Sequence, residues 1–271
     1  MTYCEHRSSL SKTFLLMKNF SILRGIGVEL LKTGIEKLDE AIGGGLLEDS
    51  NMLIIYDTYS VGWSLGVKIL QNRIKQGDFG VIVNSVLPVS SLSMEFKIAS
   101  FELEKIAKEG NLGIIDIFAS FNRIQYDDPF IYYTDMDTST FLPKFATMYR
   151  KMLGEMIRDK RPIGLTVTMD GFAFLLGEEQ YIKILQRNLA IKETARIKES
   201  RKRPLNIFLL NRDRVSKRFI SWLALYSQYI VEFYSLEEGN EEKMVVRKSP
   251  LPEFEPKTYK FRLKKDEVLI L

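Results

Sequence analysis

Apolar runs of strand length alternate with stretches of helical periodicity through the middle of the chain. Five short runs are rich in β-branched residues, and we expect each to be a buried strand: 51–56, 79–84, 112–118, 163–169 and 205–210. Apolar residues between them recur at three- and four-residue steps, which predicts helices over 62–76, 90–108, 140–159 and 178–200, the second of them capped by Ser90 or Ser91. This alternation predicts a parallel sheet covered by helices on both faces.

Two segments depart from the alternation. Residues 122–138 hold several aspartates, three tyrosines and a proline with no period, which predicts a long surface loop. After Ser227 the pattern changes to short strands joined by turn residues, at 228–234, 243–248, 258–263 and 267–271. We expect these strands to be antiparallel additions to one edge of the sheet.

Composition narrows the chemistry that the chain can carry. With 45% hydrophobic and 27% charged residues among 271, it has the make-up of a soluble globular protein. Its one cysteine, Cys4, and its one histidine, His6, lie in an expected N-terminal extension over residues 1–27. Disulfides, Cys/His zinc sites and a Ser-His-Asp mechanism therefore lack their residues. No apolar run reaches the length of a membrane span, so we expect a cytoplasmic protein without membrane partners.

The turn after the first long strand is the place to look for phosphate binding, because a helix begins there with free N–H groups. A phosphate loop of the form G-x-x-x-x-G-K-[ST] supplies two glycines, a lysine and a hydroxyl. Along residues 57–64, Asp57 replaces the first glycine, Gly62 matches the second, Trp63 replaces the lysine and Ser64 matches the hydroxyl. Two matches of four do not establish a nucleotide site.

The segment before this strand supports the comparison of residues 57–64 with a phosphate loop. Residues 33–46 read TGIEKLDEAIGGGL, which resembles the segment that precedes the Walker A strand in the KaiC/RadA branch of the RecA-like ATPases. Asp170, after the predicted strand 163–169, resembles the metal-positioning aspartate of Walker B in that branch. The resemblance spans residues 28–271 and implies one domain. Its expected fold is α/β, a RecA-like three-layer sandwich: a mainly parallel central sheet, flanking helices, and an antiparallel C-terminal extension over 228–271.

Three departures from this family bear on activity. Trp63 stands where the family lysine contacts the phosphates, and we expect its indole to cover that place. Similar proteins carry a glutamate at the end of the second strand that activates the attacking water, whereas this chain has Asn84 there and no acid until Glu95. Asp57 adds negative charge beside the phosphates. Hydrolysis needs phosphate clamping, metal charge and water activation together.

We therefore interpret the site as vestigial, made of Asp57, Gly62, Trp63, Ser64 and Asp170, with no catalytic residues, no metal site and no cofactor. The function expected is that of a pseudo-ATPase, a binding or regulatory module that contacts a partner protein or copies of itself. Purely structural readings remain open for Gly62 as a helix start, for Ser64 as a first-turn polar residue and for Asp170 as a turn cap.

Two other features carry structural readings as well. Asp116, at the end of the third strand, either lines the same cleft or forms a turn. Asp39 and the glycines at 43–45 read as a helix and the turn that ends it.

Charge is concentrated late in the chain. Residues 192–218 contain ten Lys/Arg and three acids, a net +7, whereas the whole chain carries +4. One reading is a solvated helix end whose cations oppose the macrodipole. The other is a contact with nucleic acid or a neighbouring subunit through Arg212, Arg214, Lys217 and Arg218.

A contact between these basic residues and nucleic acid would fit an alternative function. In that case the chain is a divergent RadA-paralogue-like nucleotide-binding protein or ATPase, in which Ser64 and Asp170 hold Mg²⁺ and ATP and the basic loop binds DNA. The abundance of Lys, Glu, Arg and Ile fits a thermophilic archaeal source.

Overall fold

A computed structural model describes residues 29–198, 201–236, 241–265 and 267–271. The expected N-terminal extension, with Cys4 and His6, lies outside the described residues.

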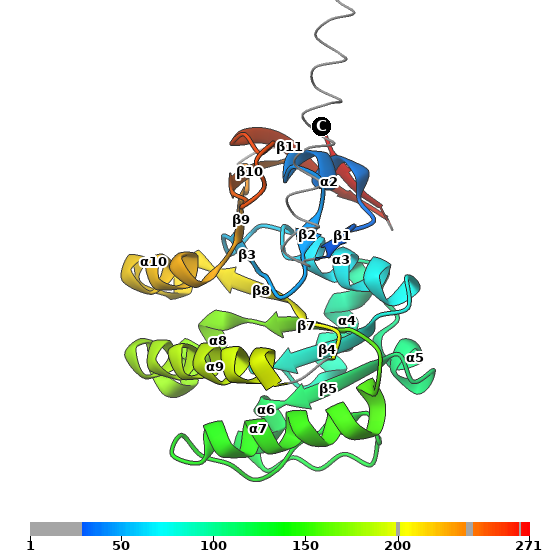
Figure 1. Ribbon diagram of the computed structural model, residues 1–271, viewed down its shortest axis with the longest axis vertical. Helices are drawn as coiled ribbons and strands as arrows, with labels where there is room; N and C mark the ends of the chain where they lie inside the picture. Colours follow the sequence, from blue (N-terminus) through cyan, green and yellow to red (C-terminus); the bar gives the residue numbers. More distant parts are fainter. Residues whose placement is uncertain (1–28, 199–200, 237–240, 266) are drawn as a thin grey trace, which may run out of the picture.

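Within those ranges, ten strands form one sheet in the order β12-β11-β10-β9-β3-β8-β7-β4-β5-β6. The neighbours from β9 to β6 pair in parallel, as the alternating pattern predicted. Figure 1 shows the C-terminal strands at one end of the sheet and β5 toward the other. A separate ribbon pairs β1 with β2. The bounds are β1 Leu30–Leu31, β2 Leu46–Leu47, β3 Asn51–Tyr56, β4 Phe79–Asn84, β5 Leu112–Asp116, β6 Ile131–Tyr132, β7 Pro162–Val167, β8 Leu205–Asn211, β9 Tyr229–Tyr234, β10 Glu242–Lys248, β11 Lys257–Lys264 and β12 Glu267–Ile270.

Helices cover both faces of the sheet and give the expected three layers. One hydrophobic core lies between the sheet and α2–α5, and a second lies between the sheet and α6–α10. The bounds are α2 Glu36–Ala41, α3 Ser64–Lys75, α4 Val89–Ile98, α5 Leu103–Lys108, α6 Ile117–Asn122, α7 Phe141–Met152 with a π-helical turn Leu153–Ile157, α8 Met169–Leu176, α9 Glu178–Lys198, a 3₁₀ turn Arg212–Arg214 and α10 Lys217–Tyr226.

Several predicted ends of helices and strands were wrong at places where one residue decides where the element ends. The helix expected over 90–108 is two helices, α4 and α5, separated near Ser100, whose φ is +53°. α4 begins at Val89, so neither Ser90 nor Ser91 caps it. The strand expected over 112–118 ends at Asp116, whose carboxylate accepts a hydrogen bond from Ala119 N and begins α6.

Residues 122–138 are more than a surface loop. They contain β6, which extends the sheet beside β5, and the side chains of Phe130 and Met136 are buried. A further helix, α8, begins at Met169, a residue predicted to end a strand, because the Thr168 side chain caps it at Gly171 N.

The strand predicted over 228–234 was given the wrong direction. β9 pairs in parallel with β3, and only its other edge pairs antiparallel, with β10. The antiparallel addition therefore consists of β10, β11 and β12. As a result, the end of β9 and the start of β10 lie beside the end of β3, which is the strand that leads into the suspected phosphate loop.

Candidate functional site

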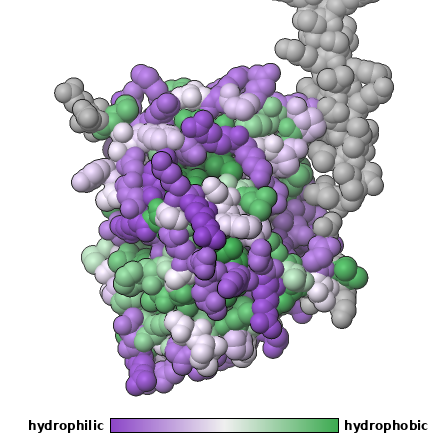
Figure 2. All heavy atoms as spheres, turned by 90° about the vertical axis from the view of Figure 1, so that its left-hand side faces the viewer, coloured by the Kyte–Doolittle hydropathy of each residue, from purple (hydrophilic) through white to green (hydrophobic). Residues whose placement is uncertain are grey.

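Polar side chains gather where the parallel strands end. Asn84 ends β4, Asp116 ends β5 and Asn211 ends β8, while Asp170 lies in the first turn of α8, and all four are buried. Carboxyl ends of parallel strands form the usual ligand-binding edge of an open α/β sheet. Figure 2 shows the side of the molecule toward which these strands run, where hydrophobic side chains lie among hydrophilic ones.

Asp57, directly after β3, ties the loop 57–63 to the end of β9. Its two carboxylate oxygens accept hydrogen bonds from Ser235 N and from Ser235 Oγ, each at 2.7 Å. One of them also accepts from Tyr59 N at 3.2 Å. The negative charge expected beside a phosphate is thus held by donors of the protein itself.

A second carboxylate lies inside the loop. Glu242, the first residue of β10, accepts from Ser60 Oγ at 2.6 Å and from Val61 N at 2.6 Å. Ser60 Oγ in turn accepts from Gly62 N at 2.9 Å. Backbone N–H groups at these loop positions are the ones that a phosphate loop offers to its ligand.

Glu242 is only 7% exposed, and burial raises the pKa of its carboxyl group. The hydrogen bonds from Ser60 and Val61 act in the opposite direction, and the charge of Asp57 raises the pKa further. The loop therefore holds an internal carboxylate whose charge is costly and is offset by the loop donors.

The three residues that align with the end of the phosphate-loop template have separate contacts. A Cβ placed on Gly62 would lie 2.2 Å from Cγ of the buried Phe233, so this position needs glycine for packing. The Trp63 ring stacks on Phe96 of α4, with ring centroids 6.4 Å apart and planes at 16°. Ser64 Oγ is buried and has no hydrogen-bond partner among the described residues.

Asp170 is committed to two neighbours. Its Oδ1 accepts from Asn211 N at 3.0 Å, and its Oδ2 pairs with Arg214 Nη1 at 3.3 Å. The aspartate aligned with the metal-positioning group thus joins the end of β8 to the 3₁₀ turn that follows it.

Asn84 occupies the place expected for the catalytic glutamate. Its Nδ2 donates to Leu87 O at 2.6 Å and to Asp116 Oδ1 at 3.1 Å. Burial raises the pKa of Asp116 to about 6, against the effect of hydrogen bonds from Ala119 and Asn84. Asp116 is fully buried and caps α6, which is the turn-forming reading of this residue.

Three of the four basic residues proposed to contact a partner are engaged within the protein. Arg212 Nη2 donates to Phe233 O at 2.7 Å, and its guanidinium lies 4.1 Å from the Tyr234 ring centroid. Arg214 pairs with Asp170, and Arg218 pairs with Glu179 at 3.2 Å on the surface. Lys217 begins α10 and is exposed.

Comparison with known proteins finds a family match for part of the chain. Residues 31–156 match the family described as ATPase, KaiC. A KaiC-like protein from the hyperthermophilic archaeon Pyrococcus horikoshii OT3 has a similar structure: the TM-score is 0.66 at 16% identity, over 90% of this chain and 99% of that chain. The family match covers just under half of the chain, and the fold over most of it is similar to that of a KaiC-like protein.

A second solved structure shares the KaiC-like fold. It is an uncharacterised protein from Pyrococcus horikoshii in complex with an unknown peptide, with a TM-score of 0.74 and 19% identity, over 89% of this chain and 98% of that chain. No curated protein matches the sequence.

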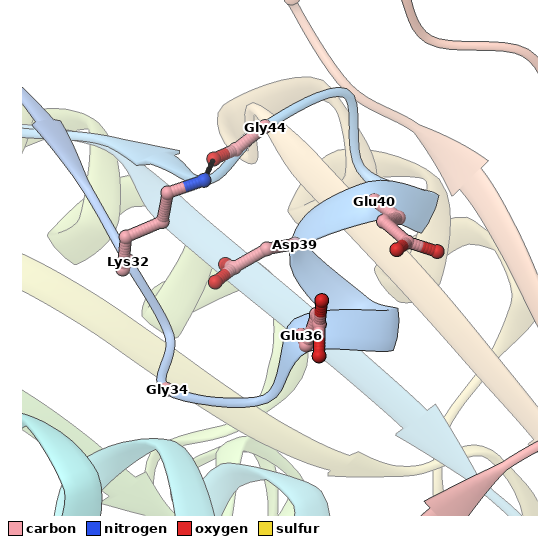
Figure 3. A pocket seen from close by; sticks show the side chains of 6 residues that line it. All are labelled: Lys32, Gly34, Glu36, Asp39, Glu40 and Gly44. Atoms are coloured by element: carbon pink, nitrogen blue, oxygen red, sulfur yellow. Dashed lines mark hydrogen bonds between the residues drawn. The ribbon is translucent and has the colours of Figure 1, made fainter.

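The segment that carried the resemblance has a structural role in this KaiC-like chain. α2 spans Glu36–Ala41, and Gly44 N donates to Asp39 O in the turn that ends it. Asp39 Oδ1 accepts from Thr33 N at 2.9 Å, and Lys32 Nζ donates to Gly44 O at 2.6 Å. Figure 3 shows this hydrogen bond between Lys32 and Gly44 at the side of an open pocket. The pocket has a volume of about 460 Å³ and is lined by Lys32, Gly34, Glu36, Asp39, Glu40 and Gly44.

The KaiC ATPase family that residues 31–156 match implies ATP with Mg²⁺, and the residues present do not fit that group. Glu242 holds the loop donors, Trp63 replaces the lysine, and Asp170 is paired with Arg214. In the ranges that the structure describes, no group of three His, Cys, Asp or Glu side chains could hold a metal ion. No helix of those same ranges is long and apolar enough to cross a membrane.

The contacts between the loop 57–63 and residues 233–242 have no signal in the sequence. Glu242, Ser235 and Phe233 lie more than 170 positions after the loop that they contact. Nothing in the residues around Glu242 marks it as buried, because it follows another glutamate and precedes a lysine. To predict these contacts, one would have to know that β9 pairs with β3 and which residues of the two strands lie opposite each other.

Proposed function

We propose that this chain is a non-catalytic KaiC-like module, a pseudo-ATPase, that acts by binding a partner protein or further copies of itself. The observation that carries the proposal is the carboxylate of Glu242 inside the loop, because its place and its donors are those that a phosphate would use. Asp170 supports it too, since a metal would have to compete with Arg214 for that carboxylate.

Exposed aromatic residues support a protein partner. Tyr59 in the loop after β3 and Phe174 on the helix after β7 are 87% and 89% exposed. Aromatic side chains of this kind are enriched at protein interfaces. The protein of similar fold that was crystallised with an unknown peptide adds weight to a polypeptide ligand.

Isothermal titration with ATP, ADP and Mg²⁺, together with a turnover assay, tests the non-catalytic part of the proposal. We expect no phosphate release above the buffer rate and no binding heat from either nucleotide. Turnover by the wild-type chain that is lost in Asp170→Asn would overturn it, because that carboxylate would then have to act in the reaction.

Light scattering over a range of protein concentrations tests self-association. If copies associate through the exposed aromatic groups, Phe174→Ser should lower the measured mass, while Arg187→Ser on α9 serves as the surface control. A mass that stays monomeric at every concentration would contradict self-association.

The alternative, a divergent nucleotide-binding protein or ATPase that touches DNA, draws its support from Lys217 and Arg218, which are exposed at the start of α10. The inward contacts of Arg212 and Arg214 reduce that support. Gel shifts at two salt concentrations test it, since phosphate contacts weaken steeply as salt rises. Binding at low salt that Lys217→Ala and Arg218→Ala together abolish would favour the alternative.

A further inference from the structure

The loop 57–63 keeps part of the chemistry of an anion-binding loop although its lysine is missing. It leads into α3, a helix of 12 residues whose N-terminal end carries partial positive charge. The Val61 N–H and the Ser60 hydroxyl both point to one acceptor group, the carboxylate of Glu242. We propose that Glu242 is an internal substitute for phosphate, which fills a latent anion site and keeps external phosphate out.

Burial distinguishes this contact from a surface hydrogen bond. Glu242 is more than nine-tenths buried, and both of its oxygens have a donor from the loop at 2.6 Å. Short hydrogen bonds to an ionised acceptor are the stronger class. A buried carboxylate without such donors would be expensive, so the loop and Glu242 depend on each other.

Ser64 is the second sign of a site built for an acceptor. Its hydroxyl aligns with the hydroxyl of the phosphate-loop template and begins α3. It is fully buried, yet no described residue accepts or donates a hydrogen bond to its Oγ. Buried hydroxyl groups in folded proteins nearly always have a partner. The carboxylate of Glu242 thus satisfies two of the groups at this loop and leaves a third without a bond.

The neighbouring charge explains why an external anion would not displace Glu242. Asp57 lies close enough to raise the pKa of Glu242 by its charge, so a phosphate entering the loop would meet two carboxylates. Removing Glu242 eliminates one of these charges and frees both donors, while Asp57 keeps its bonds to Ser235. The opened site should therefore bind phosphate weakly but measurably.

This inference rests on the proposed function, because it explains how the ATPase site is closed. It adds that closure is an autoinhibitory contact, made by one side chain of the C-terminal strands rather than by loss of the loop. β10 and the loop are joined by these contacts across 181 positions of sequence.

The test compares Glu242→Ala with Glu241→Ala, using inorganic phosphate and pyrophosphate as probes. Glu241 is the matched control because it is the adjacent glutamate, and its carboxylate pairs with Lys260 and Arg262 instead of the loop. Amide resonances of Val61, Gly62 and Ser64 are followed by NMR during each titration, with chloride at matched ionic strength as the salt control.

We expect the wild-type chain and Glu241→Ala to show no saturable shift of these amides. Glu242→Ala should show saturable shifts with both probes, with an affinity at least ~10-fold above any wild-type response. Phosphate should also raise its melting temperature, since a ligand that binds only the folded state stabilises it.

Two results would overturn the inference. One is a folded Glu242→Ala chain whose loop amides ignore both probes, and the other is saturable phosphate binding at these amides in the wild-type chain. If Glu242→Ala does not fold, Glu242→Gln takes its place, because it removes the charge and keeps the size; phosphate must then shift its loop amides, or the inference fails. ATP turnover by the wild-type chain would instead contradict the proposed function, whatever the phosphate titrations show.

Discussion

Two of the carboxyl groups buried along the same edge of the sheet, those of Glu242 and Asp116, have different surroundings. Glu242 is 7% exposed, and a loop donor meets each of its oxygens. Asp116 is fully buried, and Ala119 N and Asn84 Nδ2 both donate to the same oxygen, Oδ1. Its Oδ2 has no partner in the described parts of the chain. Burial alone therefore does not tell what a carboxyl group does for a fold.

The difference lies in which segments each group joins. Glu242 connects β10 to a loop 181 positions earlier, where its carboxylate accepts hydrogen bonds from Ser60 and Val61. Asp116 caps the helix that follows it and contacts the neighbouring strand, so its charge serves a local turn and is only half satisfied. We expect Glu242 to support the closed loop and Asp116 to retain its proton until the solution nears neutrality.

The largest effect should come from filling the space beside the closed loop. Gly62→Ala places a methyl group 2.2 Å from Cγ of Phe233, and we expect the free energy of unfolding to fall by ~3 kcal/mol in urea titrations. Gly154→Ala is the control, because no atom beyond its chain neighbours and its own helix backbone lies within 4 Å of the place that its methyl group would take. It should be neutral or slightly stabilising. Equal stability of the two variants would show that the loop is not packed against β9.

Removing the carboxylate of Glu242 should have the next largest effect. Glu242→Ala leaves the Val61 N–H and the Ser60 hydroxyl without their acceptor, and we expect a loss of about 2 kcal/mol. Thermal unfolding in phosphate-free buffer measures it, beside Glu241→Ala, whose partners lie on β11. A stabilised Glu242→Ala chain would mean that burying the charge costs more than its hydrogen bonds return.

Asp116 should give a smaller effect that depends on pH. Its pKa of about 6 in the folded chain lies above the ordinary 3.8. Its contribution to stability is therefore fully present below the ordinary pKa and is lost as the pH rises through about 6. Between ~pH 5 and ~pH 8 the expected loss is about 1 kcal/mol.

Urea titrations at several pH values measure this loss. Asp116→Asn carries no titrating group at this position, so the difference between variant and wild type isolates Asp116 from Glu242, whose pKa is also raised. Parallel curves for the two proteins over that range would contradict the expectation.

The smallest effect belongs to a surface pair outside both carboxyl sites. Arg218 and Glu179 are each about 70% exposed, so solvent screens their 3.2 Å contact. Arg218→Ala should leave the unfolding transition almost unchanged. A clear loss of stability would mean that the start of α10 is held to α9 more firmly than an exposed ion pair allows.

How much the sequence could predict depends on the range of the contacts involved. Strands 51–56 and 79–84 were predicted to the residue, because each is an unbroken run of six buried positions. The three layers and the parallel core were also predicted correctly, since a local alternation of strands and helices requires them.

Predictions were wrong where one residue or one distant partner decides the structure. The break near Ser100 depends on a backbone angle that no periodicity carries. The direction of β9 depends on its pairing with β3. The candidate site residues were named without their partners, because Asp57, Gly62 and Asp170 meet groups far along the chain. The roles assigned to them as a vestigial nucleotide site stay a prediction.

The separation of 181 positions between Val61 and Glu242 has a consequence for the order of folding. The parallel strands β3, β4, β5, β7 and β8 all precede residue 212, so a growing chain can assemble them before β10 has been synthesised. During that interval the Val61 N–H and the Ser60 hydroxyl lack the carboxylate of Glu242 as their acceptor. We expect the closed loop to be among the last native features to form, and a nascent chain that ends before Glu242 to expose a phosphate-binding surface that the finished protein conceals.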